Sequence, residues 1–261
     1  MDSRSLTVTD HRIDGHARPV ELRLYRPAGP VRAAVLYLHG GGFTGGSLDE
    51  ADGGARALAL GAGVPVLSVA YSLAPHHPFP AAPHDALGAA GWLKSSLGGK
   101  ALRLGVAGVE AGGHVAVSVT MIARDQGCTG IAAQALLGPL LDPSLTCANA
   151  ARDAAAVRNV ARCAEGYRAY LPDPSLRLHP YAAPLDCRRL AGLPPALVIT
   201  GIDPLTRDEA ERYASALSCA GITVERLGLD VPAPSLPTHG PALDALAAFF
   251  RRHLTGSKQR A

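Results

Sequence analysis

The sequence contains little of what proteins that bind nucleic acids or span membranes require. Charged residues make up 18% of its 261 residues, the formal net charge is only +3, and aromatic residues make up 5%. A nucleic-acid-binding face needs a stripe of basic residues with aromatic side chains that stack on bases, and neither is present. No apolar run reaches the length of about 20 residues that spans a bilayer. We therefore expect no nucleic-acid partner and no membrane attachment.

Cysteines are few and far apart. The five are Cys128, Cys147, Cys163, Cys187 and Cys219. None forms a Cys-x-x-Cys pair, and the polar N-terminus MDSRSLTVTDHRIDG does not resemble a secretory leader. An odd number of cysteines without a leader indicates reduced thiols. We therefore expect a cytoplasmic protein.

Apolar residues, by contrast, make up 48% of the chain, enough for the core of one large α/β domain. Continuous apolar runs alternate with helical patterns. The predicted strands are residues 33–38, 64–70, 102–107, 132–137, 196–200 and 223–227. The predicted helices are residues 82–97, 112–125, 208–220 and 241–254. This alternation is typical of a mostly parallel sheet with helices on both faces, and residues 6–25 indicate an antiparallel hairpin at its edge.

The regular alternation breaks down between residues 142 and 195. A predicted helix at 151–170 is followed there by the proline-rich segment LPDPSLRLHPYAAPLD. Such an insert is typical of a lid over the carboxyl ends of the strands, where α/β sheets bind ligands. A plain surface excursion is the alternative. We predict a core of residues 1–141 and 186–261 and a small cap insert of residues 142–185.

A glycine-rich loop follows the first buried strand directly. His39 precedes Gly40, Gly41 and Gly42, which let backbone N–H groups point inward with no side chain in the way. Loops of this type supply oxyanion donors in α/β-hydrolases. The spacing also fits a dinucleotide-binding loop or a merely structural turn. A dinucleotide site needs an acidic residue about 20 positions later, but the next strand ends in Ala-Tyr-Ser, so we expect no cofactor.

The stretch GVEAGGH lies between a predicted strand and a predicted helix. It has the spacing Gly-x-Nuc-x-Gly, and its small residues suit a tight turn that forces the central side chain outward. That central residue is Glu110, where a serine hydrolase needs a hydroxyl. A plain strand-to-helix loop is the alternative, since a carboxylate is favourable at a helix N-terminus.

Two further polar residues follow in the order nucleophile, acid, histidine. Asp203 comes just after a buried strand, and His239 lies in a loop before the last helix. Separately, Asp203 could start a turn and His239 could be an ordinary loop histidine. Together with the glycine loop and the elbow, their order favours hydrolase machinery. Glu110 with His39 and His114 has no metal-ligand spacing, so we expect no metal.

Over these stretches the chain resembles the hormone-sensitive-lipase-like carboxylesterases of the α/β-hydrolase superfamily. The similarity begins near residue 20 and includes LYLHGGGF, YSLAPHHPFPAAPHDALGAAGWL, GVEAGGHVAV, GLPPALVITGIDPLTRDEAERYASAL and THGPALDALAAFFRRHL. The resemblance implies an α/β-hydrolase fold. It also implies an acid at Asp203, a base at His239, and oxyanion donors at Gly41, Gly42 and Ala111.

The chain also departs from the family pattern. The family elbow reads Gly-Asp-Ser-Ala-Gly-Gly, whereas Val109 and Glu110 replace its Asp and Ser here, and Pro241 replaces the aromatic residue that follows His-Gly. We expect the family's N-terminal cap helices to be missing, which predicts an open site or one closed by a partner subunit. The last strand and helix could pair two subunits in a homodimer, although an apolar core face explains their pattern equally well.

Glu110 cannot simply replace the serine. Loss of that serine costs on the order of a million-fold in turnover, and attack by a carboxylate on an ester would give a mixed anhydride. We expect Glu110 to be ionised, because the helix N-terminus favours the anion. It is long enough to reach His239, placing the imidazole between Glu110 and Asp203, or to fold onto the oxyanion donors.

Three functional hypotheses follow. The first is a carboxylesterase-type protein that acts on small acyl esters or a related substrate, with serine-type hydrolysis weak or absent. The second is an inactive pseudo-esterase that binds a small ligand or a protein partner. The third is hydrolysis, or a lyase or isomerase step, that uses Glu110 as nucleophile or base.

Overall fold

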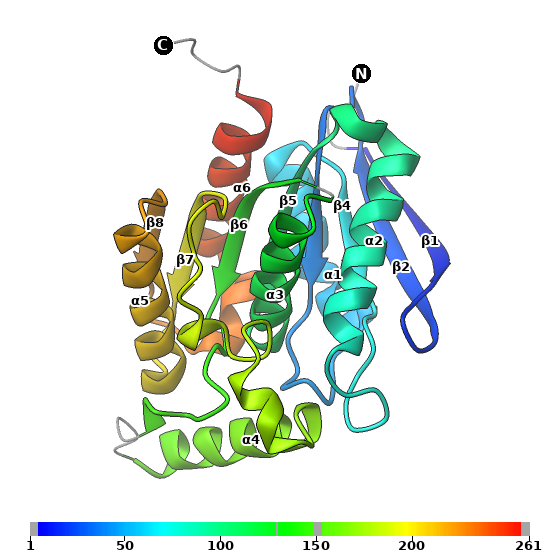
Figure 1. The fold of residues 1–261 in the computed structure, drawn as a ribbon. Helices are drawn as coiled ribbons and strands as arrows, with labels where there is room; N and C mark the ends of the chain where they lie inside the picture. Colours follow the sequence, from blue (N-terminus) through cyan, green and yellow to red (C-terminus); the bar gives the residue numbers. More distant parts are fainter. Residues whose placement is uncertain (1–4, 129, 149–152, 257–261) are drawn as a thin grey trace.

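A twisted eight-stranded sheet forms the centre of the computed structural model, which describes residues 5–128, 130–148 and 153–256 (Figure 1). The strand order is β1-β2-β4-β3-β5-β6-β7-β8. The strands are β1 (Leu6–Asp14), β2 (Pro19–Pro27), β3 (Ala33–Leu38), β4 (Val66–Val69), β5 (Arg103–Val109), β6 (Ile131–Leu137), β7 (Ala196–Thr200) and β8 (Val224–Gly228). Strands β3 to β8 are parallel, and β1 and β2 form an antiparallel hairpin at one edge. The predicted fold class and edge hairpin are confirmed.

The burial of the central strands explains why continuous apolar runs in the sequence predicted them. Every residue of β3, β4 and β7 is buried, because helices cover both faces of the sheet there. The observed ends differ from the predicted ones by at most two residues in all six predicted strands. The predicted strand at 64–70 is longer than β4, because its outer residues form the connections on either side.

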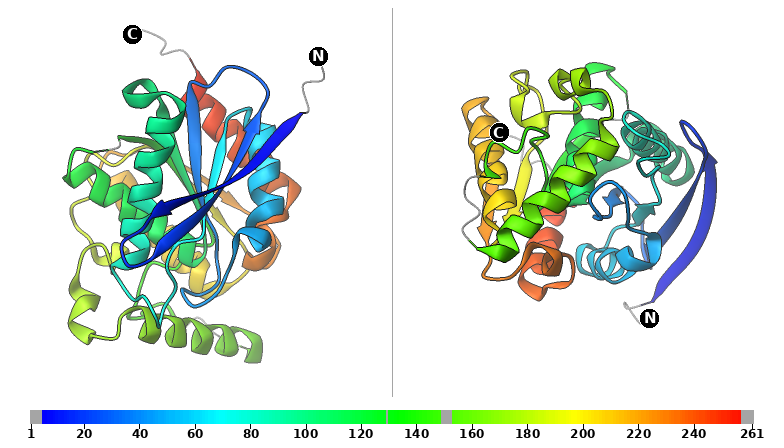
Figure 2. Two further views of the ribbon diagram at one scale, coloured as in Figure 1. Left: turned by 90° about the vertical axis from the view of Figure 1, so that its right-hand side faces the viewer. Right: turned by 90° about the horizontal axis from the view of Figure 1, so that it is seen from below.

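Helices pack on both faces of the sheet (Figure 2). One face carries α1 (Leu48–Ala62) and α6 (Gly240–Phe250), and the other carries α2 (Ala81–Leu97), α3 (Ala111–Asp125) and α5 (Pro204–Cys219). Helix α6 continues into a π-helical turn at Arg251–Thr255. Within the described ranges, no helix has both the length and the apolar character needed to cross a bilayer.

Helix α1 was not predicted from the sequence. Its buried residues recur at helical spacing, so a periodic signal was present in the sequence. A capping signal was present as well, because Ser47 and Glu50 have the spacing of a capping box, and Ser47 accepts a hydrogen bond from the Glu50 N–H at 3.1 Å. The helix ends at Gly63, whose φ of 68° is a left-handed conformation that suits glycine.

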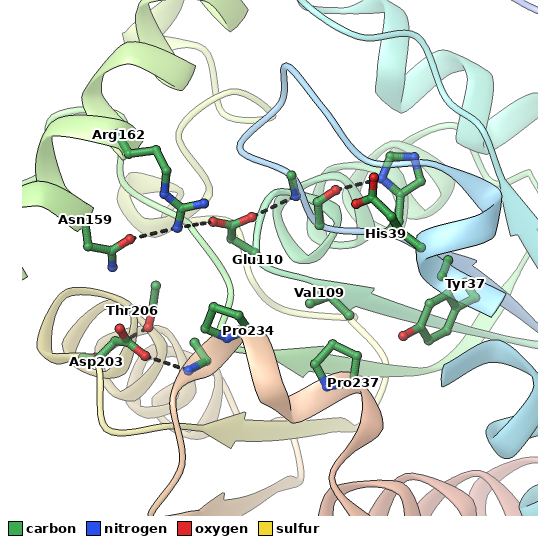
Figure 3. A pocket seen from close by; sticks show the side chains of 15 residues that line it. Tyr37, His39, Val109, Glu110, Asn159, Arg162, Asp203, Thr206, Pro234 and Pro237 are labelled. Carbon is green, nitrogen blue, oxygen red and sulfur yellow. Dashed lines mark hydrogen bonds and ion pairs between the residues drawn. The ribbon is translucent and has the colours of Figure 1, made fainter. Parts of the chain in front are cut away.

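Helix α4 (Ala154–Tyr170) belongs to the predicted cap. It crosses the carboxyl ends of the strands, as the view from below shows (Figures 1 and 2). Asp153 begins it by accepting hydrogen bonds from two backbone N–H groups of its first turn. The predicted helix at 151–170 is therefore present from residue 154, and residues 151 and 152 lie outside the described ranges. Asn159 and Arg162 on this helix face the turn after β5 (Figure 3).

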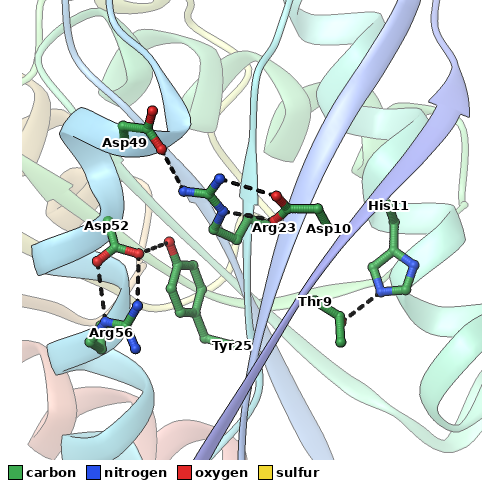
Figure 4. A network of polar contacts seen from close by, with 8 residues as sticks. All are labelled: Thr9, Asp10, His11, Arg23, Tyr25, Asp49, Asp52 and Arg56. Atoms are coloured by element: carbon green, nitrogen blue, oxygen red, sulfur yellow. Dashed lines mark hydrogen bonds and ion pairs between the residues drawn. The ribbon is translucent and has the colours of Figure 1, made fainter.

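Ion pairs and a hydrogen bond attach the edge hairpin to α1 (Figure 4). Arg23 on β2 bonds Asp10 on β1 at 2.8 Å and Asp49 on α1 at 2.7 Å. Tyr25 donates its hydroxyl to Asp52 at 2.9 Å. These contacts hold the N-terminal end of α1, which forms one wall of the candidate site.

Candidate functional site

The turn between β5 and α3 presents the Glu110 side chain at the carboxyl edge of the sheet. Glu110 has φ 49° and ψ −113°, a strained conformation for a residue other than glycine. Its backbone is fully bonded: its N–H donates to Leu137, and its carbonyl accepts from Gly113, His114 and Leu140. The predicted tight strand-to-helix turn is present.

The Glu110 carboxylate lies on the amides of the glycine loop (Figure 3). Its Oε2 accepts from the N–H of Gly41 at 2.8 Å and from that of Gly42 at 3.0 Å. Positive φ angles of 120° at Gly41 and 59° at Gly42 turn both amides toward one oxygen. The expectation that Glu110 folds onto the donors is thus met for two of the three residues. No hydrogen bond from the Ala111 N–H to this carboxylate occurs within the described ranges.

The second oxygen of Glu110 is held by the cap. Arg162 Nη2 lies 3.0 Å from Glu110 Oε1, and the same nitrogen donates to Asn159 Oδ1 at 2.8 Å. Sequence reasoning missed both residues. The helical pattern predicted that α4 exists, but which of its residues faces the elbow depends on how the helix docks. Because the Arg162 side chain is 54% exposed, this ion pair contributes modestly to stability.

Helix α4 docks directly on the glycine loop. Phe43, which follows the glycines, stacks on Tyr170 with a ring separation of 4.3 Å and contacts Tyr167 at 5.0 Å. Gly166 packs so closely on Gly42 that a Cβ on it would overlap the Gly42 carbonyl oxygen. The cap helix and the amide donors are therefore one packed unit.

Asp203 and His239 make no hydrogen bond to each other within the described ranges. Asp203 begins α5, and its Oδ2 accepts from the backbone N–H of Ala233 at 2.6 Å. His239 begins α6; its Nδ1 is buried without a hydrogen-bond partner, and its side chain makes no described hydrogen bond to Asp203 or Glu110. The predicted arrangement, with His239 between the two carboxylates, is thus not seen as hydrogen bonds and stays a prediction. The 3₁₀ turn η5 (Ala233–Thr238) supplies the N–H group that Asp203 Oδ2 accepts.

Glu110 and Asp203 border one cavity of about 260 Å³ (Figure 3). It is lined by residues of the glycine loop, α1, the elbow, α4, α5 and η5. These are Tyr37, His39, Gly40, Gly41, Glu50, Ala51, Val109, Glu110, Asn159, Arg162, Asp203, Thr206, Ala233, Pro234 and Pro237. His239 is not among them. The volume lies just below the range of about 300–1,000 Å³ typical of ligand sites, so the cavity suits a small molecule.

His39 shapes the loop. Its ring stacks on Tyr71 at 4.3 Å, and its Nδ1 lies 2.7 Å from the Gly40 carbonyl oxygen. Burial lowers the pKa of His39, so the imidazole is neutral at neutral pH. Within the described ranges, no group of three His, Cys, Asp or Glu side chains is close enough to hold a metal ion.

Comparison with known proteins gives concordant matches. The family described as alpha/beta hydrolase fold matches residues 35–228. Esterase LipI of Mycobacterium tuberculosis is 42% identical over 84% of this chain and 72% of its own length. Ethyl acetate hydrolase of Pseudomonas putida is 38% identical over 81% of this chain and 69% of its own length. A Pyrobaculum calidifontis esterase structure superposes with a TM-score of 0.85 at 33% identity, covering 95% of this chain and 85% of that one.

Proposed function

This chain belongs to the hormone-sensitive-lipase-like carboxylesterases of the α/β-hydrolase fold, and from that premise we propose that its pocket takes a small acyl ester or a related acyl ligand, with serine-type hydrolysis weak or absent. The relatives named above are esterases or ester hydrolases, which supports an acyl ligand. The cavity beneath the cap has a suitable size. Retained binding with lost turnover is the pseudo-esterase hypothesis.

One observation carries the loss of turnover. The Glu110 carboxylate accepts the N–H groups of Gly41 and Gly42, the donors that the family resemblance assigns to the oxyanion hole. An oxyanion hole accelerates acyl transfer by stabilising negative charge that develops on the substrate oxygen. Here a carboxylate oxygen of the protein already occupies those donors. A substrate carbonyl cannot use them while Glu110 stays in place.

The contacts of Asp203 and His239 also support weak or absent serine-type hydrolysis. Asp203 accepts the Ala233 amide, and no imidazole is hydrogen-bonded to it within the described ranges, whereas a catalytic acid normally orients the histidine through such a bond. Chemistry by Glu110 itself has less support, because both of its oxygens are engaged, one by two amides and the other by Arg162. Attack on a ligand would first have to break these contacts.

Turnover of p-nitrophenyl butyrate tests the proposal. We expect the native protein to release p-nitrophenol at close to the buffer rate. We expect the same of Glu110→Ser, because within the described ranges no imidazole is hydrogen-bonded to Asp203 to activate a new hydroxyl. Glu165→Ser, on the exposed side of α4, is the matched control. Native turnover that disappears in Glu110→Gln would instead establish carboxylate catalysis.

Binding is measured separately, by calorimetry with ethyl butyrate. We expect saturable binding to the native protein. Binding should weaken when Ala51→Trp, on the α1 wall, fills the cavity. Circular dichroism establishes that this variant is folded. An absence of binding to the folded native protein would contradict the proposed ligand class.

A further inference from the structure

The cavity wall carries an excess of acidic side chains. Glu50, Glu110 and Asp203 all line it, against the single cation Arg162. Arg162 is paired with Glu110. Glu50 and Asp203 have no ion-pair partner in the described part of the chain. Two carboxylates are therefore left without a countercharge around a small cavity.

Asp203 has an unused acceptor. Its Oδ2 accepts from the Ala233 N–H, which is a neutral donor. Its carboxylate makes no capping bond to α5, although the residue stands at the N-terminus of that helix. Its Oδ1 has no hydrogen bond within the described ranges. No imidazole donates a hydrogen bond to this carboxylate within the described ranges, so its free oxygen can accept a cationic partner from outside the chain.

A buried hydroxyl without a partner also faces the cavity. Tyr37 is only 2% exposed, and its side chain makes no described hydrogen bond. Its hydroxyl points into the cavity, opposite Asp203 (Figure 3). Burial raises the pKa of Tyr37, so the hydroxyl keeps its proton and can donate to a carbonyl oxygen. It is a donor available to a bound acyl group whose usual amide donors are occupied by Glu110.

We propose that the ligand of this pocket is an acyl ester with an alkylammonium group, which pairs with Asp203 while the acyl oxygen accepts a hydrogen bond from Tyr37. This inference rests on the proposed function. Glu50 adds attraction for the cation. The remaining wall is largely apolar, with Ala51, Val109 and the proline rings of η5, and it contacts the body of the ligand. A carboxylate ligand is disfavoured, because Glu110 already occupies the glycine amides and Arg162.

Two esters of nearly the same shape but different charge test this inference. Acetylcholine carries a quaternary ammonium, and 3,3-dimethylbutyl acetate carries a neutral tert-butyl group in its place. By calorimetry on the full chain, we expect acetylcholine to bind the native protein at least about tenfold more tightly, as a close charge pair in a partly enclosed site would give. The preference should decrease as salt is added.

Substitutions of Asp203 and Tyr37 test which residue binds the ammonium group and which binds the acyl oxygen. Asp203→Asn keeps an acceptor for the Ala233 N–H but removes the charge, so we expect the two dissociation constants to converge. Asp244→Asn, an exposed position on α6, should keep the tenfold preference. Tyr37→Phe should weaken both esters to a similar extent, because both present the same acyl oxygen.

The outcomes separate the two proposals. Equal binding of the two esters to the native protein overturns the ammonium inference and leaves the acyl-ligand proposal standing. A preference that survives in Asp203→Asn overturns the assignment of the cation to Asp203. If neither these esters nor ethyl butyrate bind, the proposed function fails and the inference fails with it.

Discussion

Replacing Glu209 with glutamine is expected to flatten the pH dependence of the free energy of unfolding between about pH 4.5 and about pH 8. Glu209 is fully buried on α5. Burial raises its pKa from 4.5 to about 8, against the opposing effect of hydrogen bonds from the Leu141 and Asp142 N–H groups. The unfolded chain loses this proton near pH 4.5, whereas the folded chain keeps it until about pH 8. The folded state therefore binds more protons throughout this window, and stability falls as pH rises, by on the order of 4 kcal/mol.

Glutamine has no proton to lose, and its amide oxygen can accept the same two backbone hydrogen bonds. We expect Glu209→Gln to match the native protein at about pH 5 and to be more stable by on the order of 4 kcal/mol above about pH 8. Urea unfolding at a series of pH values measures the difference. Asp208→Asn, at the neighbouring half-buried position, is the control. Parallel pH curves for native protein and Glu209→Gln would show that Glu209 titrates like an exposed carboxyl.

The position of Glu209 gives this titration a structural consequence. Leu141 and Asp142 stand where the chain leaves β6 for the predicted cap, and Asp142 in turn accepts hydrogen bonds from the N–H groups of Ser144 and Thr146. The buried Glu209 side chain on α5 thus holds the start of the segment that contains α4, and Arg162 on α4 contacts Glu110. Sequence reasoning assigned no role to Glu209, because its burial depends on the packing of α5 under that segment.

The elements with strong periodic signals could be predicted from the sequence. The strand at 196–200 matches β7 because it is a continuous apolar run, and the helix at 82–97 matches α2 within one residue because its apolar residues have helical spacing. Helix α1 was missed although its buried residues have the same spacing and Ser47 caps it. The division into core and cap at residues 142 and 185, and a homodimer, stay predictions.

The candidate site was predictable where neighbouring residues define it. The glycine loop and the elbow end adjacent parallel strands, β3 and β5, so their meeting follows from the topology. The contacts of Asp203 did not follow from the sequence. Chain order places His239 after the acid, but it does not predict that the 3₁₀ turn in between donates the Ala233 N–H to Asp203. Arg162 was missed for the same kind of reason, since helical docking sets its direction.

Substituting Gly112 with alanine is expected to destabilise the protein by about 3 kcal/mol, at the upper end of overpacking costs. Gly112 is in the first turn of α3, where the helix crosses the end of β3. A Cβ there would lie under 3.0 Å from the carbonyl oxygens of Leu38 and His39. Both are backbone atoms of the sheet and the glycine loop, so relief requires α3 or the loop to move. The gain in helix propensity, about 1 kcal/mol, is too small to offset this clash.

Gly91→Ala is the matched control for this substitution. Gly91 is an exposed residue within α2, and a Cβ there would meet nothing within 4 Å. The same chemical change should therefore stabilise the protein by roughly 0.5–1 kcal/mol, through helix propensity alone. Urea unfolding measures both variants. If Gly112→Ala instead unfolds at the same urea concentration as Gly91→Ala, α3 and β3 can move apart without loss of free energy of unfolding. The elbow is then not a rigid support for the placement of Glu110.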